Sequence, residues 1–179
     1  MEAEGGVTKR ASGKFKRRAQ DSYATPYEAV VPLLPHLGPC IYYHEPCSGA
    51  GDLVQHLASN EHRCLAQTDI DMGYDVLLIE RCEGHMFITN PPWPHPYKNG
   101  DPTLSIALHL SSIAPTWLLL SSDFAHNVYF YKIANRCVKI VAVGRVSWMG
   151  NGVKGFDNAA WYLFDINHNA ATTFIGRAT

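Results

Sequence analysis

Residues 41–58 limit the possible folds most narrowly, because they have the pattern of a strand, a glycine-bearing loop and a helix. Ile41–His44 is rich in β-branched and aromatic residues, which favour a strand. The loop Glu45–Gly51 follows, and beyond it the apolar residues recur at helical spacing. This succession is typical of the first unit of a nucleotide-binding α/β fold, in which Gly49 and Gly51 let the backbone approach a ligand closely.

The loop differs from the two common phosphate-binding motifs. It contains no G-K-[ST], so no lysine is placed for a triphosphate, and Val54 occupies the third glycine position of G-x-G-x-x-G. The acidic Glu45 at the end of the strand disfavours a pyrophosphate and favours a cationic group. The amine and the sulfonium of S-adenosylmethionine are cations of this kind.

Two further acids follow at informative positions. The segment Arg63–Asp71 predicts a second buried strand that ends in acid. Asp69 lies eighteen positions after Gly51, close to the spacing of about 20 expected for a carboxylate that binds ribose hydroxyls. Asp71 is the alternative for that role, or else a solvated loop acid. Asp75 is placed to accept a hydrogen bond from an adenine amine, so one ligand would contact three carboxylates.

The motif Thr-Asn-Pro-Pro-Trp follows the apolar run Met86–Ile88, which predicts a buried strand. Pro91 and Pro92 fix φ and donate no N–H, which leaves their carbonyls as stiff acceptors. The Asn90 side chain adds an acceptor, and Trp93 offers a flat apolar face. The arrangement suits a planar group with an NH2, such as the exocyclic amine of adenine. An ordinary strand-ending turn is the alternative interpretation.

Thr25 begins a second motif, ahead of the first strand. With Pro26 at the first helical position and Glu28 three residues after Thr25, the pattern predicts a capping box. The helix should end near Pro35 or Gly38. A helix N-terminus with a free hydroxyl suits a carboxylate ligand, and ordinary capping is the alternative.

The second half of the chain completes an alternating α/β pattern. Helical spacing is present in 104–113, and we expect another helix over 124–134. Buried strands are predicted over 117–121, 137–143 and 159–164.

Two loops are placed to cover a site. The polar loop Pro94–Asp101 has the length and composition of a lid or a substrate clamp. The glycines and basic residues of Arg145–Phe156 suit a mobile loop over the site.

Charge and composition narrow the remaining classes. The chain of 179 residues carries a net charge of −1, so no overall positive field indicates a nucleic-acid binder. Basic residues nevertheless cluster in the first eighteen positions, which predicts a flexible arm over 1–20 that contacts phosphates or remains a solvated tail. No apolar run has the length of a membrane span, and we expect a soluble intracellular protein. Five cysteines without C-x-x-C and nine scattered histidines favour neither a disulfide framework nor a metal site.

The chain resembles the S-adenosylmethionine-dependent DNA adenine-N6 methyltransferases, most of all their compact phage-type members. The resemblance lies in the order of five motifs: Tyr-x-Thr-Pro, Glu-Pro-x-x-Gly-x-Gly, a strand-end Asp, Tyr-Asp-Val-Leu and Thr-Asn-Pro-Pro-Trp. The resemblance covers roughly residues 21–165. It implies a Rossmann-like class I methyltransferase fold of α/β class, with a mostly parallel sheet, one antiparallel strand and helices on both faces. It also implies one domain over 21–179, in the cytoplasm (the host cytoplasm if the protein is phage-encoded).

The same resemblance implies roles for particular residues. Asn90 and the Pro91 carbonyl would hold the target amine, with Pro92 in the same motif, and Trp93 would stack on an extruded base. Arg145, Trp148 and Tyr97 are weaker candidates for substrate binding. Plain surface or hairpin packing is the alternative for Trp148. No metal is implied. The residues expected to bind S-adenosylmethionine are Tyr23, Thr25, Pro26, Glu45, Pro46, Cys47, Gly49, Gly51, Asp69, Asp75 and Val76.

The partner is less narrowly defined than the cofactor. Nucleic acid, DNA above all, is the expected substrate, whereas RNA or a protein glutamine amide are alternatives with the same chemistry. A non-catalytic module that binds S-adenosylmethionine or DNA is another alternative, while Val54 and the proline pair disfavour a nicotinamide-dependent oxidoreductase. The chain has no room for a separate target-recognition domain, so site specificity would be relaxed, supplied by the two loops or dependent on a protein partner.

Overall fold

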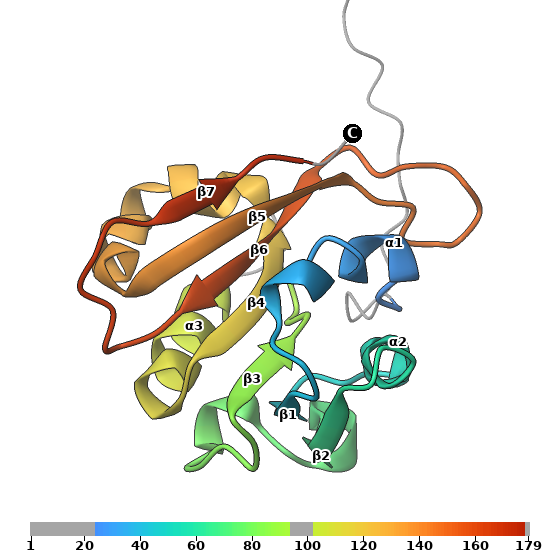
Figure 1. Ribbon diagram of the computed structural model, residues 1–179, viewed down its shortest axis with the longest axis horizontal. Coiled ribbons are helices and arrows are strands. Elements are labelled where there is room, and N and C mark those ends of the chain that lie inside the picture. The colour runs from blue at the N-terminus through green and yellow to red at the C-terminus, as the bar shows by residue number, and fades with distance from the viewer. Residues whose placement is uncertain (1–23, 94–101, 178–179) are drawn as a thin grey trace, which may run out of the picture.

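One mixed β-sheet organises the protein. The computed structural model describes residues 24–93 and 102–177, and within them seven strands lie in the order β2-β1-β3-β4-β6-β5-β7 (Figure 1). Only β6 runs antiparallel to its neighbours, β4 and β5. The strands are β1 Tyr42–Glu45, β2 Arg63–Gln67, β3 Met86–Thr89, β4 Thr116–Ser121, β5 Cys137–Arg145, β6 Asn158–Phe164 and β7 Thr173–Ile175.

Helices cover both faces of the sheet, and the alternation of side chains along the strands creates two cores. In β4, Trp117 and Leu119 face one core together with α1 Tyr27–Val30 and α2 Asp52–Ala58. Leu118 and Leu120 face the other core with α3 Pro102–Ile113. The predicted α/β class, the single antiparallel strand and the helices on both faces are therefore confirmed. Short 3₁₀ turns span Leu34–His36, Ile70–Met72, Val76–Leu78, Ser122–His126, Val128–Lys132 and Ala134–Arg136.

The order of the strands places a ligand site at one edge of the sheet. From β1 the chain continues to β2 on one side, and it then crosses to β3 on the other side of β1. Ligands of open α/β sheets bind beyond the carboxyl ends of the strands where the order reverses in this way. Here those ends carry Glu45, Gln67 and Thr89.

Four details of the sequence-based description are wrong. Thr25 and Glu28 do not form a capping box, because α1 is capped by Pro26 without a side-chain hydrogen bond. Both side chains bind other segments instead. The helix also ends at Val30 and not near Pro35 or Gly38. The second strand is present, but β2 is an edge strand whose residues are alternately exposed and half-buried, because β1 is its only neighbour among the described strands.

The helix expected over 124–134 is also absent, and 3₁₀ turns take its place. Its centre, Val128–Tyr131, consists of β-branched and aromatic residues, which have low helix propensity. Asn127 is extended at φ −72° and ψ 142°, which ends the first turn. Phe124 instead anchors the segment by ring contacts with Tyr129 and Phe130.

Across the two described ranges, no helix is both long and apolar enough to cross a membrane.

Gly84 gives a stability test of the packing that sets β1 against β3. A Cβ at this position would lie 2.6 Å from the Tyr42 carbonyl oxygen and 2.7 Å from the Tyr43 Cα, which are backbone atoms that cannot turn away. We expect Gly84→Ala to lower the free energy of unfolding by about 2 kcal/mol, and hence the Tm by roughly 6 °C in a domain of this size. Thermal unfolding followed by circular dichroism measures the shift. Gly176→Ala, whose Cβ would meet nothing within 4 Å, is the control; equal Tm values for the two variants would contradict this account.

Candidate functional site

Glu45 is the most perturbed acid at the carboxyl edge of the sheet. Its side chain is 1% exposed at the end of β1, and one carboxyl oxygen accepts a hydrogen bond from the Cys47 amide at 3.0 Å. Burial raises its pKa to about 8 and the Asp69 charge adds to this shift, whereas the hydrogen bond from the Cys47 amide opposes it. Among the described residues Glu45 has no basic partner. A cation beside this carboxyl would stabilise its charged form.

Asp69 fixes the glycine loop. One of its carboxylate oxygens accepts from the Gly49 amide at 2.8 Å, and the other accepts from the Asp71 amide at 3.0 Å. Gly51 has a φ of 89°, and a Cβ there would lie 3.0 Å from the Gln67 side-chain nitrogen. The loop therefore needs glycine for its conformation and for the close approach of Gln67.

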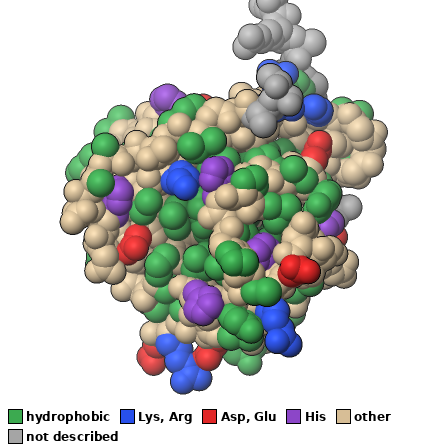
Figure 2. Space-filling model, in the orientation of Figure 1, with side chains coloured by type: hydrophobic (Ala, Val, Ile, Leu, Met, Phe, Trp, Pro, Cys, Tyr) green, Lys and Arg blue, Asp and Glu red, His purple; other side chains and the backbone are tan. Residues whose placement is uncertain are grey.

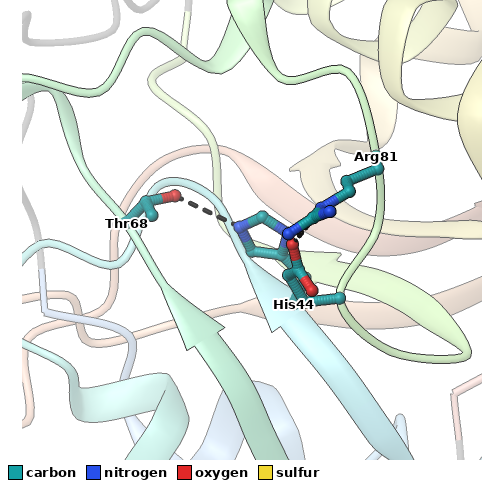
Figure 3. Close-up of polar contacts among 4 residues, drawn as sticks. His44, Thr68 and Arg81 are labelled. Atoms are coloured by element: carbon teal, nitrogen blue, oxygen red, sulfur yellow. Dashed lines mark hydrogen bonds and ion pairs between the residues drawn. The ribbon is translucent and has the colours of Figure 1, made fainter.

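The ends of β1 and β2 are joined beneath this loop. The His44 Nε2 lies 3.3 Å from the Thr68 hydroxyl, as Figure 3 shows, with Arg81 reaching in from a neighbouring segment. Burial lowers the pKa of His44, against an opposing effect of Glu83, which favours the neutral imidazole. The Thr68 amide also donates to the Glu45 carbonyl at 2.9 Å. These bonds fix the position of Glu45 at the end of β1 relative to Asp69, which follows Thr68.

The three predicted carboxylates gather around Cys47. Burial is the main cause that raises the pKa of its thiol, and the charges of Glu45, Asp69 and Asp75 act in the same direction. The Asp75 carboxylate accepts from the Leu77 amide at 2.9 Å, which caps the 3₁₀ turn containing Val76. The structure thus brings together the acids that the sequence placed along one ligand.

Asn90 lies where β3 ends, and its amide is oriented by a residue far away in the chain. Its Nδ2 donates to the Thr25 hydroxyl at 3.1 Å, and Thr25 is buried. Its Oδ1 is buried and has no hydrogen-bond partner within the part of the chain that the structure describes. A buried polar atom without a partner is costly, and a role in binding or catalysis is one explanation for it. β1 ends at Glu45 and its neighbour β3 ends at Thr89, so Asn90, the next residue, follows at the same edge of the sheet as Glu45.

Trp93 and Trp148 form an aromatic corner beside Asn90. The Trp93 indole donates to the Leu119 carbonyl at 3.0 Å, and its ring meets Trp148 edge to face with centroids 5.3 Å apart. Both rings are half-buried against the core on the α1 side. The Ser147 amide donates to Glu28 at 2.6 Å, which anchors the Trp148 segment to α1.

The remaining predicted site residues have varied positions. Pro46 and Pro91 are buried, Pro26 and Val76 are half-buried, and Pro92 and Arg145 are exposed. Tyr23, Tyr97, the loop 94–101 and the arm 1–20 lie outside the described residues. In the part of the chain that the structure describes, no group of three or more His, Cys, Asp or Glu side chains could hold a metal ion.

Sequence reasoning missed three residues that shape the site. Gln67 packs on Gly51, Glu28 holds the loop after β5, and Thr89 faces Glu45. A polar residue at the end of a predicted parallel strand is a usable signal, and it applies to Gln67 and Thr89. Glu28 had no such signal, because its partner Ser147 is 119 positions away.

One of three comparisons with known proteins gives information on the architecture. No protein-family model matches the sequence, and no curated protein matches it. Among solved structures, the chain is similar to a Listeria monocytogenes protein assigned to the class I S-adenosylmethionine-dependent methyltransferases, with a TM-score of 0.53 and 9% identity over 90% of this chain and 68% of the other. At this identity the likeness concerns the backbone alone. The protein therefore has the class I methyltransferase fold.

Proposed function

We propose that this protein transfers a methyl group from S-adenosylmethionine to the N6 amine of adenine in DNA. The observation that carries the proposal is the buried Asn90 Oδ1, which has no partner among residues 24–93 and 102–177 while the Nδ2 of the same amide is bound to Thr25. An oriented acceptor next to the Pro91 carbonyl matches a planar amine with two N–H groups to donate. It lies at the edge of the sheet where this fold binds ligands.

The residues around the glycine loop fit the cofactor. Glu45 is a buried acid that has no basic partner in the described ranges of the chain, so it suits the ammonium or the sulfonium of S-adenosylmethionine. Asp69 and Asp75 suit the ribose hydroxyls and the adenine amine, and the chain approaches closely at Gly51. When bound, S-adenosylmethionine supplies a methyl group already activated by its sulfonium.

The contribution of the protein to the reaction is orientation and charge stabilisation. The lone pair of an adenine amine is delocalised into the ring, which makes the nitrogen a poor nucleophile. Acceptance of both N–H groups by Asn90 Oδ1 and the Pro91 carbonyl draws the nitrogen toward tetrahedral geometry and stabilises positive charge as it develops. Thr25 prevents the Asn90 amide from rotating, so this acceptor geometry exists before substrate binds.

The aromatic corner favours a nucleobase as the substrate over a glutamine amide. A base extruded from a duplex loses its stacking neighbours at a cost of a few kcal/mol, and an aromatic side chain beside it offsets part of that cost. Trp93 has its indole N–H fixed on the Leu119 carbonyl, so its ring is ordered before a base arrives.

The first test removes the Asn90 acceptor. We expect Asn90→Ala to lower the rate of methyl transfer by a factor of about 100 or more, because one preorganised partner of the developing charge is lost. Asn90→Asp should keep part of the activity because a carboxylate is also an acceptor. Transfer of a tritiated methyl group to DNA, RNA and a cell extract measures the rate and identifies the substrate. Calorimetry should show unchanged cofactor affinity, and full activity in Asn90→Ala would refute the assignment.

The second test uses the raised pKa of Glu45. In the free protein the carboxyl stays protonated up to about pH 8, so binding a cation beside it must release a proton. Affinity for S-adenosylmethionine should therefore rise with pH between 6 and 8, by up to about tenfold per pH unit. Folding stability should change the opposite way: because the pKa is raised from 4.5, the stability contributed by Glu45 is complete below pH 4.5 and declines toward pH 8.

Titration calorimetry at several pH values measures this linkage. Glu45→Gln, which stays neutral, should bind more weakly at pH 8 and lose most of the pH dependence. Glu61→Gln, an exposed acid beyond the end of α2, is the matched control and should behave like the unchanged protein. An equally steep pH profile in Glu45→Gln would show that another group is titrating.

A further inference from the structure

The β5–β6 loop, residues 146–157, presents large apolar side chains to solvent. Met149 is 53% exposed, Val153 65% and Phe156 69%. Exposed apolar side chains that gather on one loop and are bordered by polar groups are a common feature of interaction sites. We call these three side chains the apolar patch. None of the three contributes to either core.

The base of the β5–β6 loop is held firmly although its tip is exposed. Val146 is buried, and its carbonyl accepts from the Gly155 amide at 2.9 Å, which closes the loop. The Asn151 side chain accepts from the Val153 amide at 3.0 Å and shapes the tip. The exposed side chains are therefore displayed on an ordered loop, so less conformational entropy is lost when they bind.

The loop lies beside the aromatic corner. Trp148 contacts Trp93 on one side, and on the other its Cδ1 would lie 3.3 Å from a Cβ at Gly155. Met149 and Phe156 directly follow Trp148 and Gly155 in the chain, so their backbone begins at the corner. In Figure 1 this loop extends past α1 at the right of the molecule, beyond the ends of β5 and β6.

Basic side chains border the patch. Arg145 at the end of β5 and Lys154 in the loop are exposed, and the Arg177 guanidinium lies beside Gly144. Figure 2 shows Lys and Arg side chains near the upper edge of the molecule, close to this end of the sheet. Cations around an exposed aromatic residue fit a nucleic acid, because phosphates can bind the cations while bases stack on the ring.

We propose that the β5–β6 loop is a wedge that enters a DNA duplex next to the target base, and that Phe156 is the side chain that fills the gap. The inference rests on the proposed function, which requires the base to leave the stack. Extrusion opens a space between neighbouring base pairs, and an apolar side chain inserted there regains part of the lost stacking. Trp93 and Trp148 would receive the base on one side while Phe156 supports the opened duplex on the other.

The test compares methyl transfer to native DNA with transfer to the same DNA after heat denaturation, which requires no knowledge of the target sequence. We expect Phe156→Ala to lower kcat/KM on the duplex about tenfold, because about one stacking contact is lost. On single strands, where no gap has to be filled, the loss should stay below about twofold. Phe156→Leu should recover most of the duplex activity. Phe174→Ala removes an equally exposed ring, at 67%, from β7 and is the control.

The outcomes separate the wedge from the proposed function. If Phe156→Ala matches Phe174→Ala on duplex DNA, or if both DNA forms lose activity equally, the wedge is refuted and the proposed function stands. If the unchanged protein binds S-adenosylmethionine but methylates neither DNA form, the proposed function fails, and the wedge, which rests on it, fails with it.

Discussion

The hydrogen bond from Asn90 to Thr25 is the contact on which the candidate site depends. It joins the end of β3 to the segment that opens α1, across 65 positions of sequence. An isolated asparagine amide at a strand end can rotate and exchange its oxygen with its nitrogen. With Nδ2 held by a buried hydroxyl, the oxygen has a defined direction, and a substrate amine meets an acceptor that needs no reorganisation. This is the condition for electrostatic stabilisation of a developing charge.

The two acids Asp69 and Glu45 next to the glycine loop determine the charge of the ligand that the loop favours. In phosphate-binding loops the backbone amides point at an anion, often with a lysine nearby. Here the Gly49 amide is already occupied by Asp69, and a buried Glu45 lies directly below. An anionic ligand would meet two acids and lose an amide donor. A cationic ligand would instead stabilise the ionised form of Glu45, which burial disfavours. A loop of this architecture therefore favours a cation here, whereas phosphate-binding loops favour an anion.

Sequence reasoning predicted the architecture, and it proposed candidate site residues from local patterns, but it did not predict the contacts that those residues make. The strand ends, the glycine loop and the proline pair are local patterns, and Glu45, Asp69, Asp75 and Asn90 follow from them directly. The contact of Thr25 could not be predicted in this way, because its capping pattern is local whereas its actual partner, Asn90, is distant. Whether a strand lies at the edge of a sheet also depends on tertiary context, so the exposure of β2 could not be predicted from its sequence. The failed helix over 124–134 shows that an apolar pattern can be satisfied by 3₁₀ turns anchored on Phe124.

The opening segment of the described chain connects the two halves of the site. Thr25 binds Asn90 and Glu28 binds the β5–β6 loop at Ser147, so a few residues contact both the acceptor motif and the loop that carries Trp148. A helix of four residues is not stable by itself. The order of α1 must therefore come from tertiary contacts such as these and from the Trp161 indole, which donates to the Ala29 carbonyl at 2.7 Å. The position of the β5–β6 loop and the orientation of the Asn90 amide therefore both depend on one short segment of backbone.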